Sequence, residues 1–371
     1  MVGTKKITVV FGTRPEAIKM CPLIKELKRR DCFDVCVCLT GQHRELTAEV
    51  MNLFGERADT DLELMRERQT LSYITSGVLE GFGEMLDKDR PHMVLVHGDT
   101  TTAFAASMAA FYRGISVGHI EAGLRSHDIT SPFPEEYNRR AISLMASLHF
   151  SPTSHAAENL MNEGISHSNI HVTGNTVADA LKYTLKENFE HPYLTESRSE
   201  RIILLTAHRR ESIGYTMEGM LGTVLDIVRD YDDVRVIFPL HPNPKVRDIA
   251  TRVLGGHDRI ILSPPLDAVT CHNIMARCYL ILTDSGGIQE EAAALGVPVL
   301  IMRNVTERPE GIVSGIARLA GTDPYQISAT VRELLDNRHI RHQMSLCQNP
   351  YGNGDACEMI ADALEGFLYN K

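Results

Sequence analysis

Short apolar segments recur along the first half of the chain, and each one ends in a run of glycine and polar residues. These segments have the length and composition of buried strands, and they span residues 7–11, 35–39, 93–96, 116–120 and 170–173. Apolar residues at helical spacing separate them, as over 71–86. Strands that alternate with helices predict a parallel, doubly wound sheet whose functional edge lies where the strands end.

The same pattern restarts after residue 200, with predicted strands at 202–206, 234–238, 260–262 and 280–283. Residues 188–200 are polar and include Pro192, which is typical of a linker between domains. We therefore predict one Rossmann-like domain over 1–187, a second over 201–354, and a separate amphipathic helix within 355–371. The predicted fold is α/β, with two doubly wound domains that face each other across a cleft.

The stretch Leu280–Met302 is the most informative part of the second half. It predicts a strand over 280–283, a turn at Ser285-Gly286-Gly287, a helix over 288–295 and a second strand. A helix start directly after a strand presents backbone N–H groups that suit a phosphate, and Glu291 is placed to bind the hydroxyls of a ribose. The stretch predicts a nucleotide diphosphate site, although an ordinary strand–helix turn with exposed glutamates would give the same pattern.

The net charge of the chain limits the kinds of molecule that it can bind as its main partner. The formal net charge is −10, which argues against nucleic acid or an anionic membrane as the main partner but allows an anionic small molecule beside a local arginine cluster. No apolar run approaches the length that spans a membrane. Because Met1–Lys6 leads directly into a strand, we expect no signal peptide.

The cysteine and histidine spacings argue against disulfide and metal sites. Eight cysteines occur without CxxC spacing, which favours a reduced, cytoplasmic location. The 16 histidines show no HxH or HExxH pattern, so no metal is expected. GxGxxG and GxxxxGK[ST] are both absent, so neither a dinucleotide cofactor nor a P-loop is indicated, and we expect no cofactor.

Three acidic residues follow predicted strands or a proline-rich loop in the first half: Asp99, Glu121 and Glu135. Each one alone could be a solvated loop carboxylate, and Glu135 could merely cap a helix over 136–145. Together at one sheet edge they predict general acid–base chemistry, because clustered carboxylates keep one another partly protonated.

Basic residues follow strands at two places. Arg14 and Lys19 flank the first predicted helix start, where a cation is unfavourable for the helix unless it binds a phosphate or forms a salt bridge. His208 and Arg209 directly follow the strand over 202–206, and an arginine at such an edge suits a diphosphate. His119 and His149 lie inside apolar strands, so we interpret both as core residues.

Several of these segments also form an ordered set of motifs that resembles a known family. The segments are Gly12–Lys19, His97–Thr101, Gly118–Arg125, Pro134–Arg139, Gly174–Thr176, His208–Glu211, Thr283–Glu291, Thr306–Glu310 and Asn349–Gly352. Over essentially the whole chain they resemble the non-hydrolysing UDP-N-acetylglucosamine 2-epimerases.

The resemblance implies a GT-B-type fold, a homodimer, and a C-terminal helix that crosses back onto the first domain. It also implies the interconversion of UDP-N-acetylglucosamine and UDP-N-acetylmannosamine for surface polysaccharides. Carried over by motif, the catalytic residues would be Asp99, Glu121, Glu135 and His208. The substrate-binding residues would be Arg14, Lys19, Asp99, Glu121, His208, Arg209, Ser285, Gly286, Gly287, Glu291 and Arg308.

In bacterial members of the family, a second UDP-N-acetylglucosamine binds beside the substrate and helps to hold the closed form. The matching positions here are Gln42, Glu45, Arg68, Arg209 and His241. The relatives carry glutamine where this chain has Glu45. A carboxylate near a bound diphosphate would be repulsive, so we expect weaker activation here.

Three other functional classes remain open from the sequence. A glycosyltransferase could use the same nucleotide site but would need only one base. A hydrolysing epimerase would release UDP and free N-acetylmannosamine, because water would enter the open intermediate. A nucleotide-sugar sensor would bind without turnover and would have no use for three acidic residues.

Overall fold

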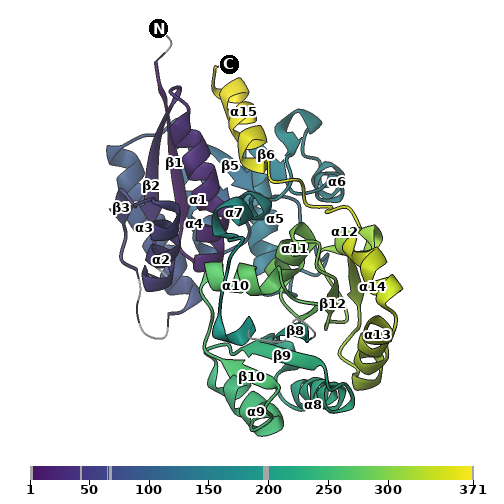
Figure 1. Cartoon of the computed structure of the whole chain (residues 1–371). Helices are drawn as coiled ribbons and strands as arrows, with labels where there is room; N and C mark the ends of the chain where they lie inside the picture. The colour runs from purple at the N-terminus through teal and green to yellow at the C-terminus, as the bar shows by residue number, and fades with distance from the viewer. Residues whose placement is uncertain (1–2, 42–43, 65, 67–68, 195–199, 370–371) are drawn as a thin grey trace. The chain divides into compact units, whose positions relative to one another are not determined.

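The structure is a computed structural model that describes residues 3–41, 44–64, 66, 69–194 and 200–369. The chain divides into two compact units (Figure 1). Unit 1 contains Met1–Tyr183 together with Tyr351–Lys371, and unit 2 contains Thr184–Pro350. The expected first domain, 1–187, ends four residues beyond the first crossing, whereas the expected second domain, 201–354, begins 17 residues later than unit 2 and ends four residues beyond it. Of the expected linker, residues 195–199 lie outside the described residues.

Unit 1 is built on a parallel sheet in the order β3-β2-β1-β4-β5-β6-β7. Its strands are β1 (Lys5–Phe11), β2 (Phe33–Leu39), β3 (Thr60–Asp61), β4 (Met93–His97), β5 (Ser116–Ile120), β6 (Leu148–Ser151) and β7 (Ile170–Val172). Its helices are α1 (Arg14–Arg29), α2 (Arg44–Phe54), α3 (Leu71–Lys88), α4 (Thr101–Phe111), α5 (Glu135–Met145), α6 (Ser154–Asn162), α7 (Thr176–Thr184) and α15 (Ala356–Tyr369).

Unit 2 repeats this design with the strand order β10-β9-β8-β11-β12-β13. The strands are β8 (Arg201–Thr206), β9 (Val234–Pro239), β10 (Ile260–Ser263), β11 (Leu280–Thr283), β12 (Val299–Ile301) and β13 (Ala317–Leu319). The helices are α8 (Tyr215–Asp230), α9 (Pro244–Leu254), α10 (Ala268–Met275), α11 (Gly286–Ala294), α12 (Pro309–Ser314), α13 (Pro324–Asp336) and α14 (Arg338–Ser345).

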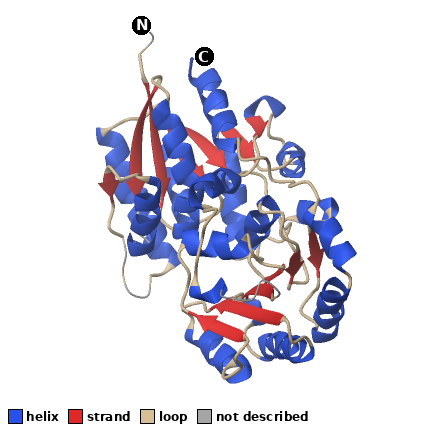
Figure 2. Ribbon diagram, viewed as in Figure 1, coloured by secondary structure: helices blue, strands red, loops and turns tan. Residues whose placement is uncertain are grey.

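Helices flank the strands in each unit, which gives both sheets a buried, apolar character (Figure 2). The residues of β4 and β11 are all buried, as their uninterrupted apolar sequences predict. The helices α4 and α1 begin with side-chain caps. Thr100 accepts a hydrogen bond from the Ala103 N–H at the start of α4, and Thr13 and Glu16 form a capping box on α1.

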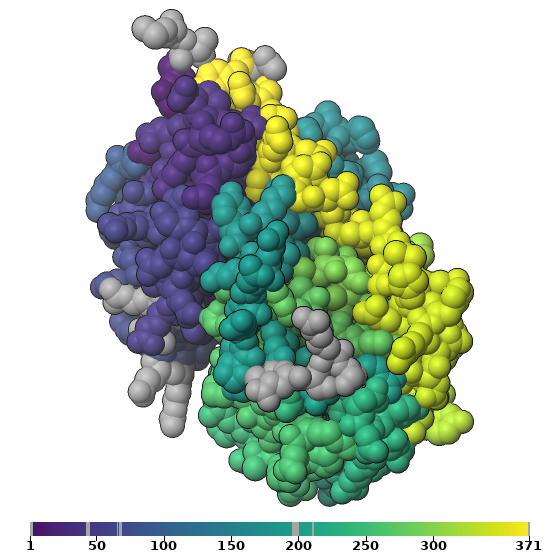
Figure 3. All heavy atoms as spheres, viewed as in Figure 1, coloured from purple at the N-terminus to yellow at the C-terminus, as the bar shows by residue number. Residues whose placement is uncertain are grey.

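The C-terminal helix packs against α1 inside unit 1, where the two lie side by side in the space-filling view (Figure 3). Arg30, at the end of α1, donates to the Asp362 carboxylate at 2.6 Å and to the Glu358 carbonyl at 3.2 Å. Among the described residues, no helix combines the length and the apolar character that crossing a membrane requires.

One local prediction is wrong in an informative way. The sequence predicts a turn at Gly286-Gly287 and a helix from residue 288, but α11 begins at Gly286 with Ser285 at the N-cap. Glycine has poor helix propensity, so sequence reasoning moved the start two residues too far. The Arg308 guanidinium explains the glycine, because a Cβ at Gly286 would lie 2.3 Å from Arg308 Nη1.

Candidate functional site

Doubly wound sheets bind ligands at the carboxyl ends of the strands, where the strand order reverses. That position lies between β1 and β4 in unit 1 and between β8 and β11 in unit 2. The segments after β1 and β4 carry Arg14 and Asp99, and the segments after β8 and β11 carry His208 and Ser285. Four of the predicted residues therefore lie at two reversal points, one in each unit.

Glu121 is held by several side chains of unit 1. It follows β5 directly, and its backbone adopts φ 62°, a left-handed conformation that a glutamate takes up only under constraint. Its Oε2 forms an ion pair with Lys19 of α1 and accepts a hydrogen bond from Asn175 Nδ2 at 2.7 Å. His97 Nε2 lies 3.6 Å from the same oxygen. Lys19 therefore has a partner that explains a cation near the start of α1.

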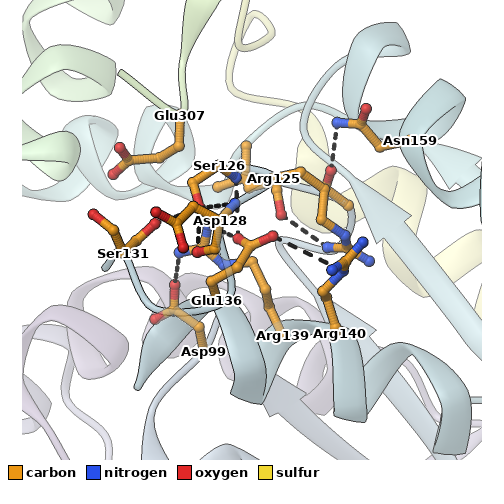
Figure 4. Close-up of polar contacts among 12 residues, drawn as sticks. Asp99, Arg125, Ser126, Asp128, Ser131, Glu136, Arg139, Arg140, Asn159 and Glu307 are labelled. Carbon is orange, nitrogen blue, oxygen red and sulfur yellow. Dashed lines mark hydrogen bonds and ion pairs between the residues drawn. The ribbon is translucent and has the colours of Figure 1, made fainter. Parts of the chain in front are cut away.

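Asp99 is fixed by two consecutive residues of α5. Arg139 Nη2 donates to Asp99 Oδ2 at 2.5 Å (Figure 4). Asn138 Nδ2 donates to the Asp99 carbonyl at 2.8 Å. The sequence predicts clustered carboxylates that keep one another partly protonated. Asp99 and Glu121 each meet a cation, Arg139 and Lys19 respectively, so charge compensation accompanies the acidic cluster.

Glu135 is the first residue of α5 and is half-buried, with Pro134 at the N-cap position. The helix thus starts one residue earlier than the expected span of 136–145. Its neighbour Glu136 is fully buried, where it accepts hydrogen bonds from the Ser126 N–H at 3.0 Å and from Arg139 at 3.1 Å (Figure 4). Glu136 therefore anchors the preceding loop, and Glu135 does not serve as the N-cap.

Arg14 opens α1 and is half-buried. The start of this helix is organised by Glu16, whose Oε2 accepts from the Thr13 N–H at 2.8 Å and whose Oε1 accepts from Thr100 Oγ1 at 2.7 Å. Burial raises the pKa of Glu16, although these hydrogen bonds act in the opposite direction. Glu16 thereby connects the segment after β1 with the segment after β4.

His119 and His149 are core residues, as the sequence predicts. They are 0% and 1% exposed, and they lie opposite each other on β5 and β6. Burial lowers the pKa of His119 to about 3 and the pKa of His149 to about 4. The neutral His119 donates from Nε2 to the Gly98 carbonyl at 2.7 Å, which fixes the backbone directly before Asp99.

In unit 2, the buried carboxylate of Asp284 organises the loop that carries His208 and Arg209. Its Oδ2 accepts both backbone N–H groups, at 2.7 Å from His208 and 2.8 Å from Arg209. Its Oδ1 lies 3.4 Å from His208 Nδ1. His241 stacks on the His208 ring with 5.1 Å between centroids, which restricts the imidazole further. Burial lowers the pKa of His241.

Arg308 is buried against the start of α11. Its Nε donates to Glu290 at 2.6 Å and its Nη1 donates to Glu307 at 2.8 Å. Burial alone would raise the pKa of Glu307, but Arg308, Arg303 and Arg209 outweigh burial and lower that pKa to about 2. Two carboxylates thus hold this guanidinium at the N-terminus of α11, where an anion is also favoured.

The rest of the predicted α11 site is ordered by neighbouring side chains. The Ser285 N–H donates to Thr283 Oγ1 at 2.9 Å. Glu291 lies in the second turn of α11, with His272 Nε2 3.6 Å from its Oε2. His272 is itself buried and bonded to Thr184 Oγ1 at 2.8 Å. Within the described ranges, no group of three His, Cys, Asp or Glu residues could hold a metal ion.

Sequence reasoning missed the residues that hold these groups in place. Five such residues lie within the family motifs but have no role predicted from the sequence: Asp284, Glu290, Glu307, Arg139 and Asn175. A charged or amide side chain beside a functional residue looks like any polar loop residue. Burial is the property that distinguishes these five, since each is less than one-tenth exposed.

Of the five expected activator positions, Gln42 and Arg68 lie outside the described residues. Glu45 is exposed in the first turn of α2, where an acidic side chain favours the helix. Arg209 and His241 lie beside His208 in unit 2. Glu45 therefore has a local structural reason to be acidic.

Comparison with known proteins agrees with these sites. The family model described as UDP-N-acetylglucosamine 2-epimerase matches residues 25–365. The UDP-N-acetylglucosamine 2-epimerase of Bacillus subtilis (strain 168) is 48% identical over 359 residues, which cover 97% of this chain and 94% of that protein.

Solved structures extend the match to three dimensions. A crystal structure from Listeria monocytogenes, described as a UDP-N-acetylglucosamine 2-epimerase, aligns with TM-score 0.97 and 47% identity over 100% of this chain and 98% of that one. The Neisseria meningitidis UDP-GlcNAc 2-epimerase bound to UDP-GlcNAc aligns with TM-score 0.92 and 41% identity, over 97% and 99% of the two chains.

The fold and these similarities define a two-domain protein of the Rossmann-like, GT-B type, as the sequence predicts. The chain belongs to the UDP-N-acetylglucosamine 2-epimerase family.

Proposed function

We propose that this protein interconverts UDP-N-acetylglucosamine and UDP-N-acetylmannosamine by eliminating UDP and adding it back, without net hydrolysis. The observation that carries the proposal is the different chemistry of the two strand-order reversals. Unit 1 places Asp99 and Glu121 there, each beside a cation. Unit 2 places His208, Arg209 and the start of α11 there, a set suited to a diphosphate.

The chemistry of carbon 2 explains the need for both kinds of site. No carbonyl adjoins this carbon, so its proton is too weakly acidic to be removed by simple enolisation. Loss of that proton can instead accompany departure of UDP from carbon 1. The C–H electron pair then forms a double bond between carbons 1 and 2, and UDP leaves with the electrons of the C–O bond. Re-addition of UDP, with protonation on the opposite face, inverts carbon 2.

In this proposal, Asp99, Glu121 and Glu135 supply the acid–base groups on the two faces of the sugar. His208, Arg209 and Arg308, with the N–H groups of Ser285-Gly286-Gly287, stabilise the departing diphosphate. Glu291 binds the ribose hydroxyls, and Arg14 and Lys19 of unit 1 contribute positive charge. The Neisseria meningitidis relative solved with UDP-GlcNAc supports this assignment of the ligand.

Turnover in deuterated water tests the mechanism. UDP-N-acetylglucosamine is supplied as the sole substrate, and proton NMR follows the products. We expect UDP-N-acetylmannosamine that carries deuterium at carbon 2, because the hydrogen added to carbon 2 comes from groups that exchange with the solvent. Full retention of the original hydrogen would rule out elimination, while UDP plus free N-acetylmannosamine would indicate a hydrolase. Unchanged substrate would point to a sensor or to a transferase that lacks its acceptor.

The proposal includes a homodimer formed through α4 and α5. Phe104 and Phe111 lie two turns apart on α4, and Tyr137 and Leu144 lie two turns apart on α5. The rings of Phe104 and Tyr137 are in contact at 5.7 Å, and Leu144 is 80% exposed. Such an apolar stripe favours a second copy of the chain. Light scattering should give twice the chain mass, and Leu144→Lys should lower it toward that of one chain.

The cellular role is proposed on narrower grounds. All eight cysteines lie in the described part of the chain as thiols, four of them buried, which supports a reduced compartment such as the cytoplasm. A supply of UDP-N-acetylmannosamine to surface polysaccharide synthesis rests on the family resemblance alone. Deletion of the gene should remove N-acetylmannosamine from the cell-surface polymers of the organism that carries it.

A further inference from the structure

Two sequence motifs have no part in the proposed chemistry: Gly174-Asn175 and Tyr351-Gly352. The first follows β7 and precedes α7. The second is where the chain returns to unit 1 after passing through unit 2. The two segments lie against each other in unit 1, because the Asn175 N–H donates to the Tyr351 carbonyl at 2.7 Å. Asn175, in this contact, also forms a hydrogen bond with Glu121.

Asn175 uses each of its polar groups on a different partner. Its backbone N–H bonds Tyr351, and its Oδ1 caps α7 by accepting from the Val177 N–H at 3.0 Å. Its Nδ2 donates to Glu121 Oε2 at 2.7 Å. The side chain is 3% exposed, so water cannot readily replace these bonds. We call Tyr351–Gly352 the return segment. One buried asparagine thus connects the return segment, the start of α7 and the Glu121 carboxylate.

The two glycines explain how the segments approach so closely. A Cβ at Gly174 would lie 2.9 Å from the Tyr351 carbonyl oxygen and 3.1 Å from Gly352 Cα. Gly352 has φ +99° and would place a Cβ 3.1 Å from Gly174 Cα. A side chain at either position would push the return segment away from Asn175.

Further contacts attach the residues just after the return segment to α7. Lys182 Nζ donates to the Gly354 carbonyl, and the Cys357 N–H donates to Asp179 Oδ1 at 3.3 Å. Tyr351 is 1% exposed, so it is packed rather than mobile at the surface. The return segment therefore has a defined place relative to Asn175.

We infer that Asn175 is a positioning residue that fixes the Glu121 carboxylate, and that the return segment at Tyr351–Gly352 sets the place of Asn175. The inference rests on the proposed function, in which Glu121 exchanges protons with the sugar. Lys19 and His97 approach the same Oε2 from α1 and β4. Asn175 Nδ2 adds a directional hydrogen bond to this oxygen at 2.7 Å, and such a bond restricts the rotation of the carboxylate.

Two variants of Asn175 test the first part. Asn175→Asp keeps the size and the helix-capping oxygen but removes the donor to Glu121. Asn175→Ser also keeps a capping oxygen, but its side chain is too short to reach Glu121. We expect kcat to fall about 100-fold in both, while the affinity for UDP alone, measured by calorimetry, stays within about twofold. Thr153→Ala, which removes the cap of α6, is the control for lost capping and should keep kcat near wild type.

A cycle with Glu121→Gln separates positioning from general damage. If Asn175 acts through Glu121, Asn175→Asp should lower the residual rate of the Glu121→Gln protein by less than about threefold. Equal losses in both backgrounds would overturn the inference. So would an Asn175→Asp or Asn175→Ser protein with kcat within about twofold of wild type.

The return segment is tested with a matched pair of glycine substitutions. Gly352→Ala places a side chain against Gly174, whereas Gly164→Ala introduces similar backbone strain at φ +89° where a Cβ would meet no atom within 4 Å. We expect a kcat loss of about tenfold or more for Gly352→Ala alone. Equal kcat for these two variants would overturn the role of the return segment. If Gly352→Ala does not fold, Tyr351→Ala, which loosens the buried segment, is compared with Gly164→Ala instead.

The wild-type assay distinguishes failure of this inference from failure of the proposed function. Wild-type protein that leaves UDP-N-acetylglucosamine unchanged would overturn the proposed function and this inference with it. Active wild-type protein together with fully active Asn175 variants would overturn only the inference.

Discussion

Asp284 holds His208 at two points, through the backbone N–H at 2.7 Å and beside the imidazole Nδ1 at 3.4 Å. Asp284 is fully buried and lies at the end of β11, so it is carried by the central part of the sheet. The imidazole is therefore oriented by the sheet itself. A residue proposed to stabilise a departing diphosphate needs such support, because small displacements are costly in catalysis.

Replacing Asp284 should disturb both the fold and the reaction. Asp284→Asn leaves a buried amide N–H against backbone donors, so we expect a loss of roughly 1–3 kcal/mol of unfolding free energy and a kcat loss of about tenfold or more. Urea unfolding and steady-state kinetics measure the two effects. Asp323→Ala, which removes the cap of α13 in the same unit, is the control and should lose stability with little change in kcat. A fully active Asp284→Asn protein would contradict the orienting role.

The three acidic residues of unit 1 should each be needed for turnover. Asp99→Asn, Glu121→Gln and Glu135→Gln are expected to lower kcat by roughly 10²–10⁴-fold, the usual contribution of a general acid or base. Glu163→Gln, which removes a carboxylate that pairs with Arg125 in the same unit, should leave kcat nearly unchanged. If a carboxamide variant keeps the normal rate, that residue is instead a helix cap or a solvated loop carboxylate.

Arg308 should be more important for nucleotide binding than its neighbour Arg303. Arg308→Lys keeps a positive charge but cannot reproduce the paired contacts to Glu290 and Glu307. We expect the affinity for UDP to fall by about tenfold or more in this variant. Arg303→Lys should change it by less than about threefold, although Arg303 contacts the same Glu307. Calorimetric titration with UDP gives both values, and equal losses would contradict a direct role for Arg308.

Unit 1 should lose stability in mild acid because His119 and His149 are buried in their neutral forms. Their pKa values of about 3 and about 4 lie below the ordinary value of 6.5. The unfolded chain therefore binds protons first, and stability that is complete above pH 6.5 declines as the pH falls toward 3. At pH 5 each histidine should cost roughly 2 kcal/mol.

Urea unfolding followed by circular dichroism at pH 7.5 and pH 5 measures this loss. His149→Phe should lose roughly 2 kcal/mol less than wild type between the two pH values, since one titrating ring has been removed. Exposed His155 provides the control, because His155→Phe should leave the pH dependence unchanged. An equal pH dependence in wild type and His149→Phe would contradict the buried-neutral interpretation.

Activation by UDP-N-acetylglucosamine should be present but weak. Starting from purified UDP-N-acetylmannosamine, we expect a lag that traces of the epimer abolish, and Glu45→Gln should shorten that lag by removing a charge near the second ligand. Glu49→Gln, a change of the same type in the same helix, should have no effect. Linear progress from time zero, unaltered by Arg68→Ala, would mean that the chain works without an activator.

The sequence by itself determined the class of fold and the position of the candidate site. Parallel strands are buried on both faces, so β4 and β11 are nearly continuous apolar runs that can be read directly. The polar residues after them, such as Asp99 and His208, are visible because strand ends form the functional edge. The limits of β5 and β11 were predicted to the residue.

Only the tertiary structure decided which residues hold the functional groups. Asn175 and Glu121 lie 54 positions apart, and Asp284 and His208 lie 76 apart, so no local pattern pairs them. The same is true of Gly286, whose place at the start of α11 depends on the Arg308 side chain. Burial and long-range hydrogen bonds arise when separate strands meet at one sheet edge. The sequence therefore marks the polar groups that follow each strand, whereas packing decides which of them become partners.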